Sequence, residues 1–172
     1  AVCEQVEDPK HAKGVVKRAV THVVTPGVNM DSEAIPAHLP NYLGALFQDE
    51  EGSHFALADV TTGEFRATSF GSLEAAFSEC RRLGVRELVF AGEMDDSLRE
   101  RAEKSSVLLS CISPEEFQSN GIEGLDELPA EGPSNAAECL VSYLGRVHPK
   151  VLPTLARIEF YMPDSGMILE EE

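Results

Sequence analysis

The chain has 172 residues, a length that suits one domain and a flanking segment. Its 30 Asp and Glu residues outnumber its 14 Lys and Arg residues, so the formal net charge is −16 at pH 7. DNA binding draws much of its affinity from basic groups that neutralise phosphates, so this acidity argues against a DNA-binding surface outside a locally basic region. No apolar run approaches the roughly 20 residues that cross a bilayer, and we expect neither a membrane-spanning helix nor a membrane partner.

The first 27 residues are predicted to form a small unit of their own. Residues 2–6 and 19–24 have the apolar, β-branched character of short strands. Asp8-Pro9 predicts a helical turn between them, with proline at its first position. Residues 28–40 show no clear period and are predicted to be a linker.

Basic side chains gather in this first part of the chain. The first 22 residues carry a net charge of +1, whereas the remaining 150 carry −17. The basic residues are Lys10, Lys13, Lys17 and Arg18. Lys13 and Lys17 are four residues apart and would share one face of a helix. The four residues are a candidate DNA-proximal patch, although a solvated surface is the more common role of such a pattern.

Residues 41–150 are predicted to form one α/β domain. Apolar and alternating runs indicate three antiparallel strands, after which helical periods alternate with short strands. The expected elements are strands at 41–48, 55–60, 64–70, 87–91 and 107–112, helices at 73–83, 95–104 and 134–147, a short helix beginning at Ser113-Pro114, and an exposed loop at 119–133. This order predicts a mixed five-stranded sheet flanked by helices, which is a ribonuclease H-like architecture. Residues 151–172 are expected to begin a link to a further domain, with strand-like segments at 157–162 and 167–169.

A ribonuclease H-like fold raises the alternative of a metal-dependent nuclease, active or degenerate. Such a site needs carboxylates clustered on the central strands. The first predicted strand has none in its body, and only Glu87 and Glu93 flank the fourth. We therefore expect no metal site, and the nuclease remains the second hypothesis.

Other motifs for catalysis or cofactor binding are missing from the sequence. It contains no GxxxxGK[ST] phosphate loop, and its five histidines suggest no Ser-His-Asp or Cys-His arrangement. The four cysteines form no CxxC pair, a usage typical of a reducing cytoplasm; they are Cys3, Cys80, Cys111 and Cys139. Two of them, Cys80 and Cys139, lie on apolar helical stripes and are predicted to be buried. We predict no catalytic, metal-binding or cofactor-binding residue and no enzymatic activity in this chain.

One hairpin has a weak likeness to a nucleotide site. Residues 59–63 resemble the phosphate-binding hairpin of the sugar-kinase and actin fold, in which Asp and Thr-Gly serve a nucleotide. A simpler prediction is a turn shaped by the side chains of Asp59 and Thr61, with Gly63 at a positive φ angle.

Several blocks of the sequence resemble the MutS family of mismatch-repair ATPases. They are VCEQVEDPK at 2–10, KG at 13–14, VKR at 16–18, VVTPG at 23–27, NYLGAL at 41–46, DVTTGEF at 59–65 and LPTLARIEFYMPDSGMILE at 152–170. The likeness covers nearly the whole chain, although residues 93–133 match only in the order of their elements.

The resemblance implies a division into parts. Residues 1–27 would be the tail of the mismatch-binding domain I, and residues 41–150 the ribonuclease H-like connector domain II, which carries no catalytic site in this family. Residues 151–172 would lead toward the core and lever domain III. The connector joins the DNA-reading domain to the ATPase and offers a docking surface to MutL. The family's Phe-x-Glu mismatch wedge, its phosphate loop for ATP and Mg, and its main dimer contacts match nothing here, so we expect a monomer, whereas the whole protein would be a homodimer on mismatched DNA.

The docking surface for MutL is expected around residues 114–118 and the loop that follows. The candidate contacts are Glu115, Phe117, Gln118 and Asn120. An aromatic side chain beside hydrogen-bonding groups suits the centre of a small interface. If Phe117 is instead buried beneath the sheet, the polar side chains would make the contacts alone. The resemblance also implies a place of action in the bacterial cytoplasm, at the nucleoid.

Overall fold

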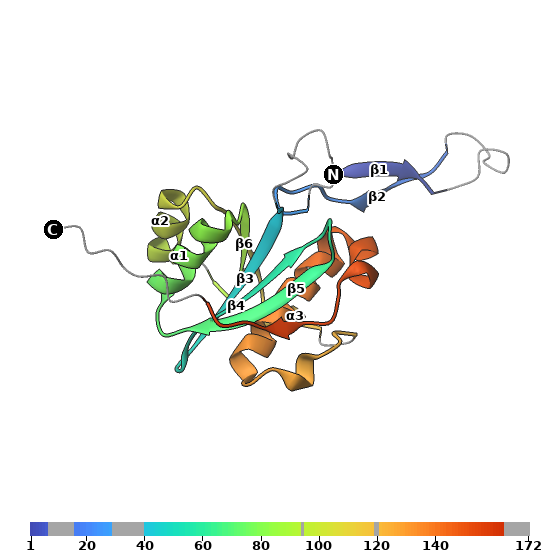
Figure 1. Ribbon diagram of the computed structural model, residues 1–172. Helices are drawn as coiled ribbons and strands as arrows, with labels where there is room; N and C mark the ends of the chain where they lie inside the picture. The colour runs from blue at the N-terminus through green and yellow to red at the C-terminus, as the bar shows by residue number, and fades with distance from the viewer. Residues whose placement is uncertain (7–15, 29–39, 94, 119–120, 164–172) are drawn as a thin grey trace.

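The computed structural model describes residues 1–6, 16–28, 40–93, 95–118 and 121–163, which form a separate two-stranded hairpin and a larger α/β domain (Figure 1). The hairpin consists of β1 (Val2–Gln5) and β2 (Arg18–His22). The domain comprises β3 (Tyr42–Asp49), β4 (Gly52–Asp59), β5 (Glu64–Phe70), α1 (Leu73–Leu83), β6 (Glu87–Ala91), α2 (Asp96–Lys104), β7 (Leu108–Ile112), the 3-10 turns η1 (Pro114–Glu116) and η2 (Leu125–Glu127), α3 (Glu131–Val147), the 3-10 segment η3 (Pro149–Thr154) and β8 (Glu159–Phe160). The predicted Asp8-Pro9 turn, most of the 28–40 linker and the predicted strand at 167–169 lie outside the described residues.

The sheet of the domain is mixed, as predicted, but it has six strands in the order β7-β6-β3-β4-β5-β8. The pairs β3–β4 and β4–β5 are antiparallel, and the pairs β3–β6 and β6–β7 are parallel. The predicted count of five is wrong because β8 adds itself to the outer edge of β5, in parallel, through Arg66↔Glu159 and Ala67↔Phe160. The strand-like segment predicted at 157–162 does contain β8, but the sequence does not show that it joins this sheet, because the pairing with β5 is long-range.

Turn chemistry explains the two hairpins of the sheet. Between β3 and β4, Asp49 Oδ1 accepts the amide hydrogens of Glu51 and Gly52 at 2.8 and 3.2 Å, so the second strand begins at Gly52 and not at the predicted residue 55. Between β4 and β5, Asp59 Oδ1 accepts both the amide and the hydroxyl of Thr61, at 2.8 and 2.6 Å. Gly63 has a φ of 81°, which confirms the predicted turn.

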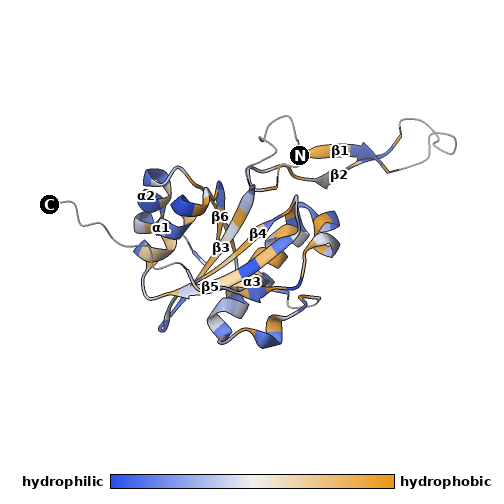
Figure 2. Ribbon diagram, viewed as in Figure 1, coloured by the Kyte–Doolittle hydropathy of each residue, from blue (hydrophilic) through white to orange (hydrophobic). Residues whose placement is uncertain are grey.

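Helices cover the two faces of the sheet separately. Figure 1 shows α1 and α2 together on one side and α3 on the other. Successive side chains of β3 point to opposite faces of the sheet and so contribute to both cores. Leu43 and Ala45 pack with α3, whereas Leu46 packs with α1 and α2. The apolar colour of the strands, set against the polar outer surfaces of α1 and α2, shows the same layering (Figure 2).

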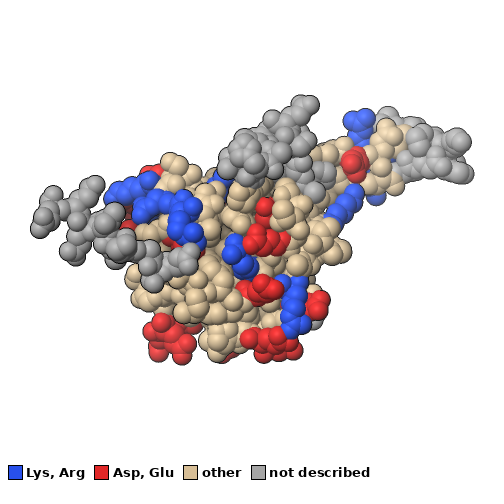
Figure 3. All heavy atoms as spheres, viewed as in Figure 1, with Lys and Arg blue, Asp and Glu red and all other residues tan. Residues whose placement is uncertain are grey.

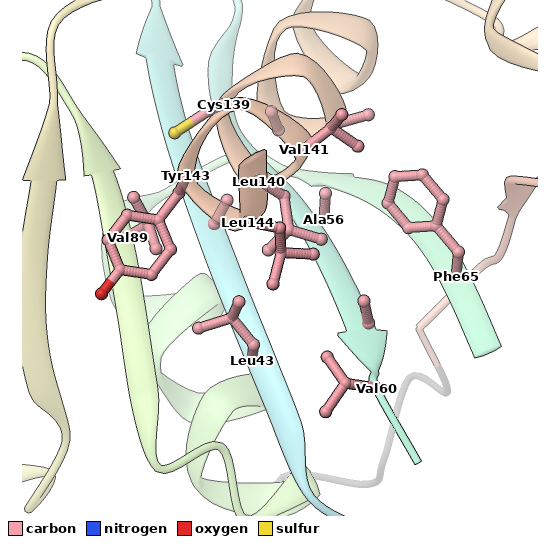
Figure 4. Packing of buried hydrophobic residues seen from close by; sticks show 14 of the residues in the cluster. Leu43, Ala56, Val60, Phe65, Val89, Cys139, Leu140, Val141, Tyr143 and Leu144 are labelled. Atoms are coloured by element: carbon pink, nitrogen blue, oxygen red, sulfur yellow. The ribbon is translucent and has the colours of Figure 1, made fainter. Parts of the chain in front are cut away.

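The α3 side holds the larger core. Leu140 and Leu144 are fully buried there, and Figure 4 shows both directed from the helix onto β3 and β4. The predicted start of this helix at Ser134 is wrong by three residues, since α3 begins at Glu131. Pro133 and Gly132 made the first turn look non-helical in the sequence. Proline is tolerated there because the first amide hydrogens of a helix have no partner within it. Glycine is needed at position 132 because a Cβ there would lie 2.3 Å from the His54 ring.

Local signals place the other two helices. Ser72 Oγ accepts the Ala75 amide at 3.3 Å, and Gly84 ends α1 with a φ of 67°, so both predicted boundaries are confirmed. Asp95 caps α2, which lies within the predicted range 95–104, and only Leu98 and Ala102 of that helix are buried. No helix within the described ranges is long and apolar enough to cross a membrane.

Candidate functional site

The predicted docking segment is an irregular stretch pressed against α3. Its predicted helix is wrong in extent: only one 3-10 turn forms, and Phe117 is already extended, with φ −64° and ψ 139°. The amide of Gln118 donates to Ser142 Oγ on α3 at 2.7 Å. That bond holds the chain against α3 and competes with a further helical turn. It is a long-range contact, so the helix-start residues Ser113-Pro114 could not reveal it.

The structure brings three of the four predicted docking residues onto this stretch. Glu115 and Gln118 are exposed, and Phe117 is half-buried against the α3 core. Asn120 lies outside the described residues. Phe117 is thus partly exposed beside polar side chains, as the docking hypothesis expects, and is not fully buried beneath the sheet.

Sequence reasoning missed a partly open pocket of about 250 Å³ that begins three residues after Gln118. Apolar side chains line much of it, among them Phe65, Ile122, Val141, Leu152 and Leu155. A pocket of this volume has room for an aromatic or branched aliphatic side chain. Its walls come from β5, α3, η3 and the loop after Gln118, which is why no single stretch of sequence signalled it.

The part of the sequence that forms η1, η2 and most of α3 is acidic. Residues 105–145 contain no Lys, Arg or His and seven acidic residues: Glu115, Glu116, Glu123, Asp126, Glu127, Glu131 and Glu138. Acidic side chains also gather along the lower edge of the molecule in Figure 3. Arg157 offsets part of this charge, because its guanidinium pairs with Glu127 and lies 3.7 Å from Glu123. A partner at this surface would gain from basic side chains of its own.

The candidate basic patch is described only in part. Lys17 and Arg18 are exposed at the start of β2, and Lys10 and Lys13 lie outside the described residues. The same hairpin exposes apolar side chains: Val6, Val20 and Val24 retain 52, 58 and 47% of their surface. A two-stranded hairpin of this kind is marginal by itself, so these valines are surfaces that need cover from elsewhere.

The chain enters the sheet domain through residues 23–28, which contact the end of α3 and the core beneath it. The Val23 amide donates to the Val147 carbonyl at 2.8 Å, at the end of α3. Val28 is 1% exposed and belongs to the α3 core. The incoming segment is therefore bound to the sheet domain before the predicted linker begins.

The chain leaves along β8, where a buried carboxylate holds it. Tyr161 donates its hydroxyl to Glu79 Oε1 at 3.2 Å, and Arg82 forms two bonds of 2.7 Å to the same carboxylate. The Arg66 guanidinium lies 5.0 Å from the centre of the Tyr161 ring. Arg82 holds the pKa of Glu79 below its usual value despite burial, while burial chiefly raises the pKa of Tyr161.

The carboxylates required by the nuclease hypothesis are apart. Glu87 is fully buried and its carboxylate accepts hydrogen bonds from protein groups, whereas Glu93 is exposed. Within the described part of the chain, no three His, Cys, Asp or Glu side chains gather as a metal site would require. Burial, which the sequence predicted for Cys80 and Cys139, is confirmed.

Comparison with known proteins defines the class first. Residues 1–33 match the family model described as MutS domain I. The DNA mismatch repair protein MutS of Bacillus subtilis is 33% identical over 171 residues, which is 99% of this chain and 20% of that protein. The corresponding proteins of Lactobacillus acidophilus and Streptococcus agalactiae are 37 and 38% identical over 84 and 94% of this chain, and over 17 and 18% of their own lengths.

The chain therefore belongs to the MutS family of DNA mismatch repair proteins, as the sequence resemblance implied. It spans about a fifth of the length of the relatives it matches.

Proposed function

We propose that this chain is a connector segment of a MutS mismatch-repair ATPase, without catalytic residues of its own. It would couple mismatch recognition to the ATPase and provide a docking surface for MutL. Mismatched DNA, ATP and Mg would bind to other parts of a homodimeric protein acting at the nucleoid in the cytoplasm. The strand order β7-β6-β3-β4-β5 supports the finer assignment of the fold as ribonuclease H-like.

The observation that carries the coupling role is that the incoming and outgoing segments bind to one rigid sheet. Val28 packs beneath α3 on one side, and β8 pairs with β5 at the far edge. Both faces of the intervening sheet are covered and close-packed, and such an interior deforms little. When one attached segment is displaced, the sheet therefore moves as a unit and displaces the other segment.

The docking role is supported by the surface around η1. It combines exposed polar side chains with the half-buried Phe117, and the pocket lined by Ile122 and Val141 begins three residues after Gln118. Interfaces concentrate their energy in a few apolar or aromatic contacts with a polar rim. We infer that MutL places an apolar side chain in the pocket and polar groups against Gln118.

A binding measurement tests the docking role directly. We expect the double variant Gln118→Ala, Asn120→Ala to weaken binding of the MutL N-terminal domain, measured by surface plasmon resonance, by about 5- to 30-fold, which corresponds to about 1–2 kcal/mol. Gln48→Ala, at the exposed end of β3, is the matched control and should bind as the wild type does. Equal binding by the double variant would remove this surface from the proposal.

A further inference from the structure

Glu87 is a buried carboxyl group that the docking surface does not use. It is the first residue of β6 and is 0% exposed. Burying such a group is costly unless hydrogen bonds replace those of water. Its position in the core is therefore explained by the groups that donate to it.

Three neutral groups from three parts of the chain donate to this carboxylate. Oε1 accepts the Tyr143 hydroxyl from α3 and the Ser110 hydroxyl from β7, the latter at 3.1 Å. Oε2 accepts the backbone amide of Gly27 at 3.0 Å. Figure 4 shows the Tyr143 ring directed from α3 toward β6, beside Val89. Burial first, and the bond to Glu87 second, raise the pKa of Tyr143 to about 12, so its hydroxyl remains a donor at physiological pH.

Gly27 fits this place because it lacks a side chain. A Cβ there would lie 2.8 Å from Leu43 Cδ1 and 3.2 Å from Glu87 Cβ. The backbone can thus approach the sheet closely enough for its amide to reach the carboxylate. Val23 and Val28, on either side, are fixed by the bond to Val147 and by burial.

We propose that Glu87 is the positioning residue that fixes residues 23–28, and through them the β1–β2 hairpin, to the connector sheet. This inference rests on the proposed coupling function. It identifies Glu87 as the group that links a movement of the hairpin to a movement of β6. Glu87 accepts from the incoming backbone with one oxygen while α3 and β7 hold the other oxygen. The orientation of the carboxylate is therefore set by the sheet domain, and the incoming chain follows it.

Three variants separate positioning from core stability. In Glu87→Gln the amide oxygen can face Gly27, because the Tyr143 and Ser110 hydroxyls can accept from the amide nitrogen, so this variant should retain the fixed position. Glu87→Leu removes the acceptor of the Gly27 amide and of the Ser110 hydroxyl, while the Tyr143 hydroxyl keeps Ser110 Oγ at 3.3 Å as an acceptor. The triple variant Glu87→Leu, Ser110→Ala, Tyr143→Phe also removes the two side-chain donors, which restores an apolar core while the Gly27 amide stays without its acceptor.

Two native cysteines provide the measurement. Cys3 on β1 and Cys111 on β7 are exposed, whereas Cys80 and Cys139 are buried. Spin labels on the exposed pair report the hairpin-to-sheet distance by pulsed electron resonance, and amide hydrogen exchange reports on Gly27. We expect the same distance distribution in the wild type and in Glu87→Gln. The triple variant should give a broader distribution than either, and about three- to tenfold faster exchange at Gly27, the effect of losing one hydrogen bond.

A distance distribution and Gly27 exchange in the triple variant equal to those of the wild type would overturn the proposal. So would a Glu87→Gln variant that behaves like the triple variant. Neither measurement involves MutL. The positioning role of Glu87 can therefore fail while the docking proposal stands, and a failure of the docking proposal would leave these distances unchanged.

Discussion

The β1–β2 hairpin and the six-stranded sheet differ in how they bury their apolar side chains. Val6 and Val20 leave about half of their surface exposed, whereas Leu43 and Leu57 in the sheet are fully buried. Two strands offer no second layer, while α1, α2 and α3 cover the sheet on both faces. The comparison shows that the sheet is stabilised by its own contacts, whereas the described residues of the hairpin leave its valines uncovered.

The largest change in stability is expected from a substitution in the α3 core. Leu144→Ala should lower the free energy of unfolding by about 2–5 kcal/mol, because it opens a cavity in a fully buried layer. Urea unfolding followed by far-UV circular dichroism measures it. Leu108→Ala is the matched control, since Leu108 is 48% exposed on β7 and should cost less than about 1 kcal/mol. Similar losses in the two variants would show that α3 does not form the main core.

A smaller effect is expected where the chain leaves the sheet. Glu79→Gln should lower stability by about 1–2 kcal/mol, since it weakens the paired bonds to Arg82 and the bond to Tyr161. Glu74→Gln is the control on the same helix, because Glu74 and its partner Arg101 are both partly exposed.

The same contact predicts a dependence on pH. The folded-state pKa of Glu79 is lowered, chiefly by Arg82, so its stabilising effect is complete above the unfolded-state pKa. It is lost as the pH falls through the lower, folded-state value. As the pH falls below about 5, the wild type should therefore lose more stability than Glu79→Gln. The difference should correspond to the protonation of one carboxylate. Parallel pH profiles would contradict the assignment.

The smallest perturbation is chemical labelling. Burial raises the pKa of Cys80 and of Cys139 to about 12, so neither thiol should react with iodoacetamide in the folded protein near pH 8. Cys3 on the hairpin and Cys111 on β7 are exposed and should be labelled. Intact-mass spectrometry counts the adducts. Rapid labelling at Cys139 in native conditions would show that the α3 core opens readily.

The sequence predicted the parts of this fold that depend on neighbouring residues. Ser72 and Gly84 set the ends of α1, and Asp59 shapes its turn, through bonds a few residues long. The start of α3 was missed because Gly132 is explained only by the distant His54. Strand β8 was missed as part of the sheet because its pairing with β5 spans the whole domain.

The candidate site was predictable to a lesser degree. Sequence reasoning selected the stretch from Glu115 to Gln118, where exposed and half-buried side chains do lie together. It missed the pocket and the contacts of Glu87, since each joins segments far apart in the chain. Gly27 entered the sequence analysis only as the last residue of the VVTPG block, although its lack of a side chain is what lets the incoming backbone reach β6.

Three backbone amides test most directly the claim that the incoming segment belongs to the sheet while the hairpin does not. The Val6 amide donates to the Lys17 carbonyl within the hairpin region, the Val23 amide to Val147, and the Gly27 amide to Glu87. Native-state hydrogen exchange should find Val23 and Gly27 opening with nearly the free energy of the sheet, and Val6 opening at far lower cost. Protection of Val6 equal to that of Gly27, or fast exchange at all three amides, would contradict the account.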